Sequence, residues 1–137
     1  MTSGASVGRT VRWGRHTRRR VIGLVACANA VAALAGAVSL AVGWLSLGDQ
    51  LTGRLPWGSP VLGGVALAVL VGLPNLVLAA LALRHDARTA AGAVAVGAGL
   101  VAWIVVEVAF LRVVEGLQVA YALVGILLVW LGLHEDR

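Results

Sequence analysis

The sequence predicts an all-α protein, an integral membrane bundle of four antiparallel transmembrane helices, and two observations lead to this fold class. The first is composition: hydrophobic residues make up 60% of the 137 positions, and the mean hydropathy of +0.94 exceeds that of soluble domains. The second is that the apolar residues form stretches long enough to cross a bilayer as helices, which takes about 20 residues. The expected spans are 21–47, 60–83, 89–111 and 117–133.

These stretches do not fit β-strands. They lack a period of two, and they are longer than the roughly 10 residues of a membrane barrel strand. Ala, Gly, Leu and Val dominate them, which suits membrane helices that pack closely. The chain therefore divides into a tail at 1–20 and a four-helix domain at 21–137, whose spans are joined by short loops.

The tail before the first span is basic and contains no acidic residue. Its arginines are Arg9, Arg12, Arg15, Arg18, Arg19 and Arg20. Beside a membrane helix, such a tail indicates a cytoplasmic end that contacts anionic lipid headgroups. We prefer this interpretation to nucleic-acid binding, the other common role of a basic tail.

Two export-signal patterns overlap the start of the first span. The run Arg18-Arg19-Arg20 resembles a twin-arginine signal, and the segment ending at Cys27 resembles a lipoprotein cleavage site. Only six residues separate Arg20 from Cys27, fewer than the apolar region of a signal peptide requires. The apolar run also continues to Leu47. We therefore expect an uncleaved membrane anchor, with both signals as alternatives.

The loops predict the orientation of the spans. The second connection, 84–88, contains two arginines and one aspartate, which places it in the cytoplasm by the positive-inside rule. The first connection, 48–59, and the third, 112–116, carry no excess of positive charge. Both termini are then expected in the cytoplasm of a bacterium, with the spans in its inner membrane. The tryptophans expected at the membrane interfaces are Trp44, Trp57 and Trp130.

Two asparagines are expected at one depth inside the bundle. Asn29 and Asn75 both lie eight residues from the cytoplasmic end of their span, about 12 Å at 1.5 Å per residue. Gly97 and Gly125 fall at the same level on the third and fourth spans. We interpret the two amides as fastening the helices, through a hydrogen bond to each other or to nearby backbone. A ligand site is the alternative.

The second span contains a proline, Pro74, which has no backbone N–H to donate. A kink is expected near Leu70 and Val71. The carbonyl of Leu70 then needs another donor, and Asn29 or a water molecule is expected to supply it.

Small residues at four-residue spacing predict where helix backbones approach closely. The predicted stripes are Ala28, Ala32 and Gly36 in the first span, Gly64, Ala68 and Gly72 in the second, and Ala91, Ala95 and Gly99 in the third.

Glu107 is the one acidic residue well within a predicted span. It lies four residues before Leu111, about 6 Å from the outer edge. The polar residues expected near this level are Ser39, Gln118 and Tyr121. Two interpretations remain open. Glu107 is either a structural residue hydrogen-bonded to these groups, or a site that responds to protons or cations, with Arg54 or Arg112 as its counterion.

Two stretches of the chain resemble segments of small, uncharacterised four-span membrane proteins of bacteria. They are Pro56-Trp57-Gly58-Ser59-Pro60-Val61-Leu62-Gly63-Gly64 and Trp103-Ile104-Val105-Val106-Glu107. The resemblance implies a four-span fold and no particular activity. The small multidrug-resistance transporters also have four spans, but their essential glutamate is in the first span and Glu107 is in the third. No functional residue of that family therefore carries over.

The function expected from the sequence is that of a non-enzymatic accessory or interaction component. The chain lacks a nucleophile elbow, a phosphate-binding loop and a zinc-protease motif, so we expect no catalytic residues, no cofactor and no metal. The alternative is a small transporter or channel subunit that uses Glu107. The expected partners are the lipid bilayer and anionic headgroups, and not nucleic acid. A second copy of the chain and another membrane protein remain open.

Overall fold

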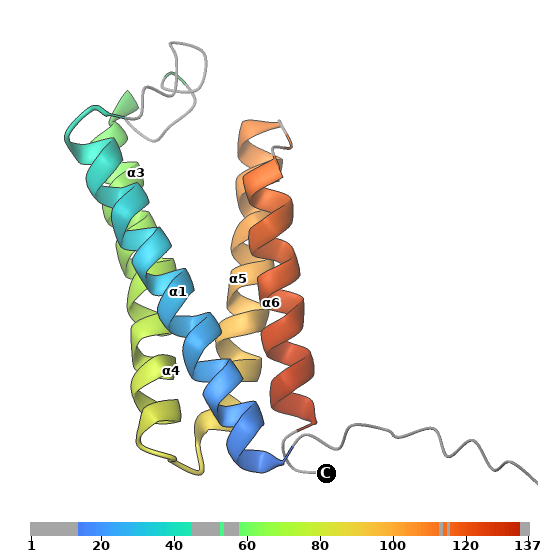
Figure 1. Ribbon diagram of the computed structural model, residues 1–137. Helices are drawn as coiled ribbons and strands as arrows, with labels where there is room; N and C mark the ends of the chain where they lie inside the picture. The colour runs from blue at the N-terminus through green and yellow to red at the C-terminus, as the bar shows by residue number, and fades with distance from the viewer. Residues whose placement is uncertain (1–13, 45–52, 54–57, 113, 115, 135–137) are drawn as a thin grey trace, which may run out of the picture.

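The computed structural model describes residues 14–44, 53, 58–112, 114 and 116–134, and the regular elements among them are all helices (Figure 1). In chain order they are α1 (Arg15–Ala41), α3 (Pro60–Leu67), η2 (Ala68–Gly72), α4 (Leu73–Leu83), α5 (Thr89–Leu111) and α6 (Gly116–Leu133). α3, η2 and α4 follow one another without a break and form the second span. With α1, α5 and α6 this gives four helices long and apolar enough to cross a membrane.

The first helix lies nearer the N-terminus than expected. It begins at Arg15, six residues before Val21, because arginine is a good helix former and the basic residues simply extend the helix. It ends at Ala41, where Leu47 was expected. Gly43 adopts a φ of 75°, a left-handed conformation that glycine takes without strain, and this stops the helix.

The other three helices have nearly the bounds that the sequence predicts. The second span begins at Pro60, where the Ser59 hydroxyl accepts a hydrogen bond from the Leu62 N–H (3.4 Å). The third runs over Thr89–Leu111, and the fourth begins at Gly116. Thr89 is completely buried, and its hydroxyl donates to the Asp86 carbonyl (2.7 Å), which fixes the turn before α5.

The second span is irregular where Pro74 predicts a kink. Ala68–Gly72 forms a π-helical turn, in which the Leu73 N–H donates to the Ala68 carbonyl. Such wide turns accommodate a residue that cannot take part in regular helical hydrogen bonding. Beyond the turn, the side-chain amide of Asn75 donates to the Val71 carbonyl (2.8 Å). The Asn75 amide is therefore an extra donor at this turn, to Val71 and not to Leu70. Asn29 does not donate to the Leu70 carbonyl, since its Nδ2 has no hydrogen-bond partner.

The four helices form two hairpins. In the first, α1 packs against the second span in opposite directions, since a Cβ at Gly23 would meet Ala82 and one at Gly64 would meet the Ala37 carbonyl oxygen. In the second hairpin, α5 and α6 also run in opposite directions, since a Cβ at Gly97 would meet Gly125 and one at Gly132 would meet Ala90.

The two hairpins meet closely only toward one end, which we call the basic end and define by Arg15, the turn 84–88 and Leu133. All four helices contribute to the core there. Its buried members are Ile22, Ala26, Leu78, Ala79, Ala82, Ala93, Leu128 and Leu131. Toward the opposite, far end the two hairpins diverge (Figure 1). The two hairpins therefore share a core at the basic end, and their helices stand apart at the far end.

Candidate functional site

The structure places the two asparagines level with each other, on α1 and α4. The contacts of Gly23 with Ala82 and of Gly72 with Ala33 lie on either side of them along the two helices. Both side chains are buried, with exposed fractions of 6% for Asn29 and 1% for Asn75.

These two amides do not fasten α1 to α4 in the expected way. The nitrogen of Asn75 donates within its own helix, to Val71. Its oxygen Oδ1 has no hydrogen-bond partner, and neither has Nδ2 of Asn29. An unpaired buried polar atom costs about 1–3 kcal/mol. One hydrogen-bond acceptor, Oδ1 of Asn75, and one donor, Nδ2 of Asn29, therefore lack a partner at this depth.

Gly97 and Gly125, which were expected at the same level as the asparagines, contact each other across the second hairpin. They are the point at which α5 and α6 cross, and a Cβ on Gly97 would lie 2.5 Å from the Gly125 carbonyl oxygen. A Cβ on Gly132 would likewise lie 2.7 Å from the Ala90 carbonyl oxygen. The glycines hold two backbones together, which side chains larger than hydrogen would prevent.

The stripe predicted for the third span is not the packing face of α5. Ala91, Ala95 and Gly99 are exposed, and a Cβ at Gly99 would meet no atom within 4 Å. In α1, likewise, Ala28 and Ala32 are exposed, while the buried row runs through Ala26, Ala30, Ala33 and Ala37. A four-residue spacing identifies a helix face, but an Ala- and Gly-rich helix has several such faces.

Glu107 is half-buried on α5, within electrostatic range of Tyr121 on α6. Gln118, one turn from Tyr121, is buried with 8% exposed. Neither Glu107 nor Gln118 is without an interaction partner. Three of the four polar residues expected at this level therefore belong to the α5–α6 hairpin.

Ser39 belongs to the other hairpin. It lies near the far end of α1, and that end stands apart from α5 and α6 (Figure 1). Of the two proposed counterions, Arg112 is exposed and ends α5 with a left-handed φ of 52°. Arg54 lies outside the described residues.

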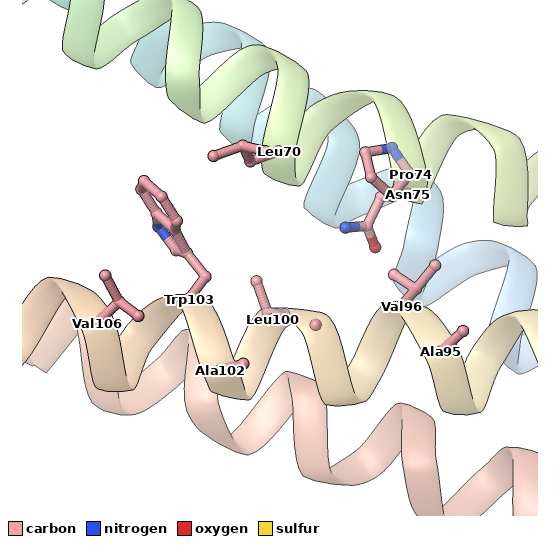
Figure 2. A pocket seen from close by; sticks show the side chains of 10 residues that line it. Leu70, Pro74, Asn75, Ala95, Val96, Leu100, Ala102, Trp103 and Val106 are labelled. Carbon is pink, nitrogen blue, oxygen red and sulfur yellow. The ribbon is translucent and has the colours of Figure 1, made fainter.

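A groove of about 470 Å³ separates the second span from α5 (Figure 2). Leu70, Pro74 and Asn75 form one wall, and α5 forms the other. The α5 residues include Val96, Gly99, Leu100, Trp103 and Val106. Figure 2 shows the side chain of Asn75 pointing across the gap toward α5. The groove has the volume of a small-molecule site.

Sequence analysis identified Asn75 but not the groove beside it. The α5 wall was not recognised because the four-residue spacing of Ala95 and Gly99 predicts a face that packs against another helix. The available signal was the pair Pro74-Asn75, since a proline distorts a membrane helix and a polar side chain beside it can satisfy the backbone groups that the distortion frees.

The basic end brings the arginines of α1 beside the turn 84–88. The Arg19 guanidinium nitrogen Nη1 donates to the His85 carbonyl (2.7 Å). The rings of His16 and His85 lie edge to face with centroids 6.0 Å apart. Arg15, Arg20, Arg84 and Arg88 are exposed around them. In the described part of the chain, no three His, Cys, Asp or Glu side chains form a group that could hold a metal ion.

The outer surface of the helices is apolar, as Leu24 (71% exposed), Phe110 (71%) and Leu123 (61%) illustrate. A surface of this kind on four helices of spanning length defines the class of multi-pass membrane proteins. Comparison of the chain with family models, with curated proteins and with solved structures finds no match.

Proposed function

We propose that this chain is a non-enzymatic binding component of a bacterial inner membrane, an antiparallel four-helix bundle whose groove takes up an apolar molecule from the bilayer. The observation that carries the proposal is the groove between the two hairpins. Of its lining side chains, only Asn75 and Trp103 bear a polar atom. An apolar cavity bounded by membrane helices favours an occupant that is itself dissolved in lipid.

The packing of the hairpins supports this function. They are held together by small side chains near the basic end, including Ala26, Ala82 and Ala93. At mid-height their contact is narrower, formed by Ala33, Val71 and Leu100. A molecule entering sideways from the bilayer therefore displaces little of the core that holds the bundle together.

In the proposed orientation, the basic end faces the cytoplasm. The exposed arginines Arg15, Arg20, Arg84 and Arg88 then contact anionic lipid headgroups. A reporter fused after Arg137 tests this orientation. Activity of a cytoplasmic reporter is expected, and activity of a periplasmic reporter would overturn it.

The binding function is tested with bromoundecane, an apolar quencher of tryptophan fluorescence. The chain has five tryptophans, so the four others are replaced by Phe to leave Trp103, and the protein is reconstituted in phosphatidylcholine vesicles. Saturable quenching of Trp103 is expected. Gly99→Leu, which adds a side chain at a residue lining the groove whose Cβ would meet no atom within 4 Å, should remove the saturable part. Quenching that rises only linearly would contradict the proposal.

The matched control is a variant that keeps Trp130 as its single tryptophan. Trp130 lies on α6 with 52% of its surface exposed, and it does not line the groove. Its quenching should rise linearly with the probe dissolved in the lipid.

A second function, a transporter or channel subunit, is favoured by the position of Glu107, a half-buried carboxylate within a helix of membrane-spanning length. An ionisable residue inside a membrane bundle is characteristic of ion pathways. Flux in proteoliposomes under an imposed pH gradient tests this function. Transport requires flux in the wild type and its loss in Glu107→Gln, whereas equal rates in both would exclude a role for this carboxylate.

A further inference from the structure

Building on the proposed function of the groove, we infer that its ligand is a neutral apolar molecule carrying one hydroxyl group, which donates a hydrogen bond to Oδ1 of Asn75. Three observations carry the inference: the groove itself, the unpaired oxygen beside it, and the apolar character of the other lining residues.

The oxygen of Asn75 specifies a donor. The residue is 1% exposed and lines the groove. Its nitrogen is already used by the Val71 carbonyl, and Oδ1 has no partner. In a groove with a mostly apolar lining, an unpaired amide oxygen favours a ligand group that can donate a hydrogen bond to it.

The absence of charged side chains in the groove wall limits the class of ligand to neutral molecules. The residues that line the groove include no acidic and no basic side chain. A phosphate, carboxylate or ammonium group would lie there without a counterion, at a high cost in lipid. A neutral hydroxyl meets the need of Asn75 and adds no charge.

The position of Asn75 places the hydroxyl of the ligand below the level of the lipid headgroups. Eight residues separate Asn75 from Leu83, so it lies about 12 Å inside the apolar region. From Ala95 to Val106 the groove follows α5 for about 16 Å. An elongated alcohol with its hydroxyl at Asn75 and its chain running past Trp103 fits this geometry.

The test compares bromoundecanol with bromoundecane on the variant that keeps Trp103 alone, in phosphatidylcholine vesicles. The probes have the same chain and bromine and differ in the hydroxyl. Bromoundecanol is expected to saturate at about three to ten times lower concentration in the membrane, the contribution of one hydrogen bond.

Two leucine variants at equal depth make the comparison specific. Asn75→Leu should remove the advantage of the alcohol and leave the binding of bromoundecane. Asn29→Leu removes a buried amide at the same level, but Asn29 does not line the groove, so this variant should keep the advantage. If Asn75→Leu does not fold, the comparison of the two probes on the parent protein still shows whether the hydroxyl group strengthens binding.

The outcomes separate the inference from the function beneath it. Equal saturable binding of both probes, or an advantage that survives in Asn75→Leu, overturns the hydroxyl and leaves the groove as an apolar site. Absence of saturable quenching by either probe overturns both. A dimer by light scattering that dissociates in Gly99→Leu would assign the groove to a second copy of the chain and overturn both as well.

Discussion

The two faces of α5 have opposite environments, although the residues that define them are close in sequence. Gly97 lies against the backbone of α6, where a Cβ would come within 2.5 Å of a carbonyl oxygen. Gly99, two residues away, borders the groove, and a Cβ there would meet nothing within 4 Å. One face holds a hairpin together, and the other leaves room for a ligand. A glycine in a membrane helix therefore indicates either close packing or empty space, and only its direction distinguishes them.

The largest expected effect is at the packed face. Gly97→Leu should destabilise the protein by about 3 kcal/mol, the upper end of overpacking, because the obstacle is backbone and cannot rotate away. Gly99→Leu, with the same change in volume, should shift stability by less than about 0.5 kcal/mol. Thermal unfolding in detergent measures both. Equal losses of stability in the two variants would mean that the faces do not differ.

The same pair shows what the sequence could predict and what it could not. Length and hydropathy predict where the second and third spans begin and end, because a helix that crosses a bilayer needs about 20 consecutive apolar residues. Depth can also be counted along a helix, and Asn29 and Asn75 lie level as expected. Rotation about the helix axis cannot be counted in this way. In α5 the rows through Gly97 and through Gly99 both contain small residues. Between Thr89 and Glu107 no charged, amide or hydroxyl side chain separates a buried from an exposed face.

Contacts between helices are unpredictable for the same reason. Ser39 and Glu107 were expected in one polar layer because they lie at similar depth, but the hairpins diverge at that level. The amides of Asn29 and Asn75 were expected to bond to each other or to nearby backbone, and the Asn75 amide makes the second kind of bond, to the Val71 carbonyl of its own helix. Neighbours at one depth are specified by packing, which depends on the whole bundle.

The asparagines provide the second prediction, of intermediate size. Asn75→Leu should lower stability by about 1 kcal/mol, because the Val71 carbonyl loses its side-chain donor. Asn29→Leu should be neutral or stabilising, since it removes a buried nitrogen that has no partner. Unfolding of both variants in the same detergent tests this difference in sign. A marked loss in Asn29→Leu would show that its amide is paired in the membrane.

A smaller effect is expected at the polar residues of the α5–α6 hairpin, which are Glu107, Gln118 and Tyr121. Glu107→Gln should change stability by no more than about 0.6 kcal/mol, the typical strength of one hydrogen bond between membrane helices, because Gln keeps hydrogen-bonding capacity. Glu107→Leu removes that capacity and serves as the comparison. If Glu107→Gln is as damaging as Glu107→Leu, the charge of the carboxylate, rather than its hydrogen bonding, stabilises the packing of α5 against α6.

The smallest effect is expected at the basic end, where the hairpins are already held by a shared core. Arg19→Ala removes the hydrogen bond from the guanidinium to the His85 carbonyl, an exposed interaction that contributes about 0.5 kcal/mol. Arg15→Ala removes an equal charge from an exposed position of the same helix and should be silent. Thermal unfolding compares the two, and proteolysis within the turn 84–88 should be faster in Arg19→Ala alone. Equal rates in both variants would assign the effect to net charge, and the closure of the basic end would then rest on the apolar core of Ile22, Ala82 and Leu131.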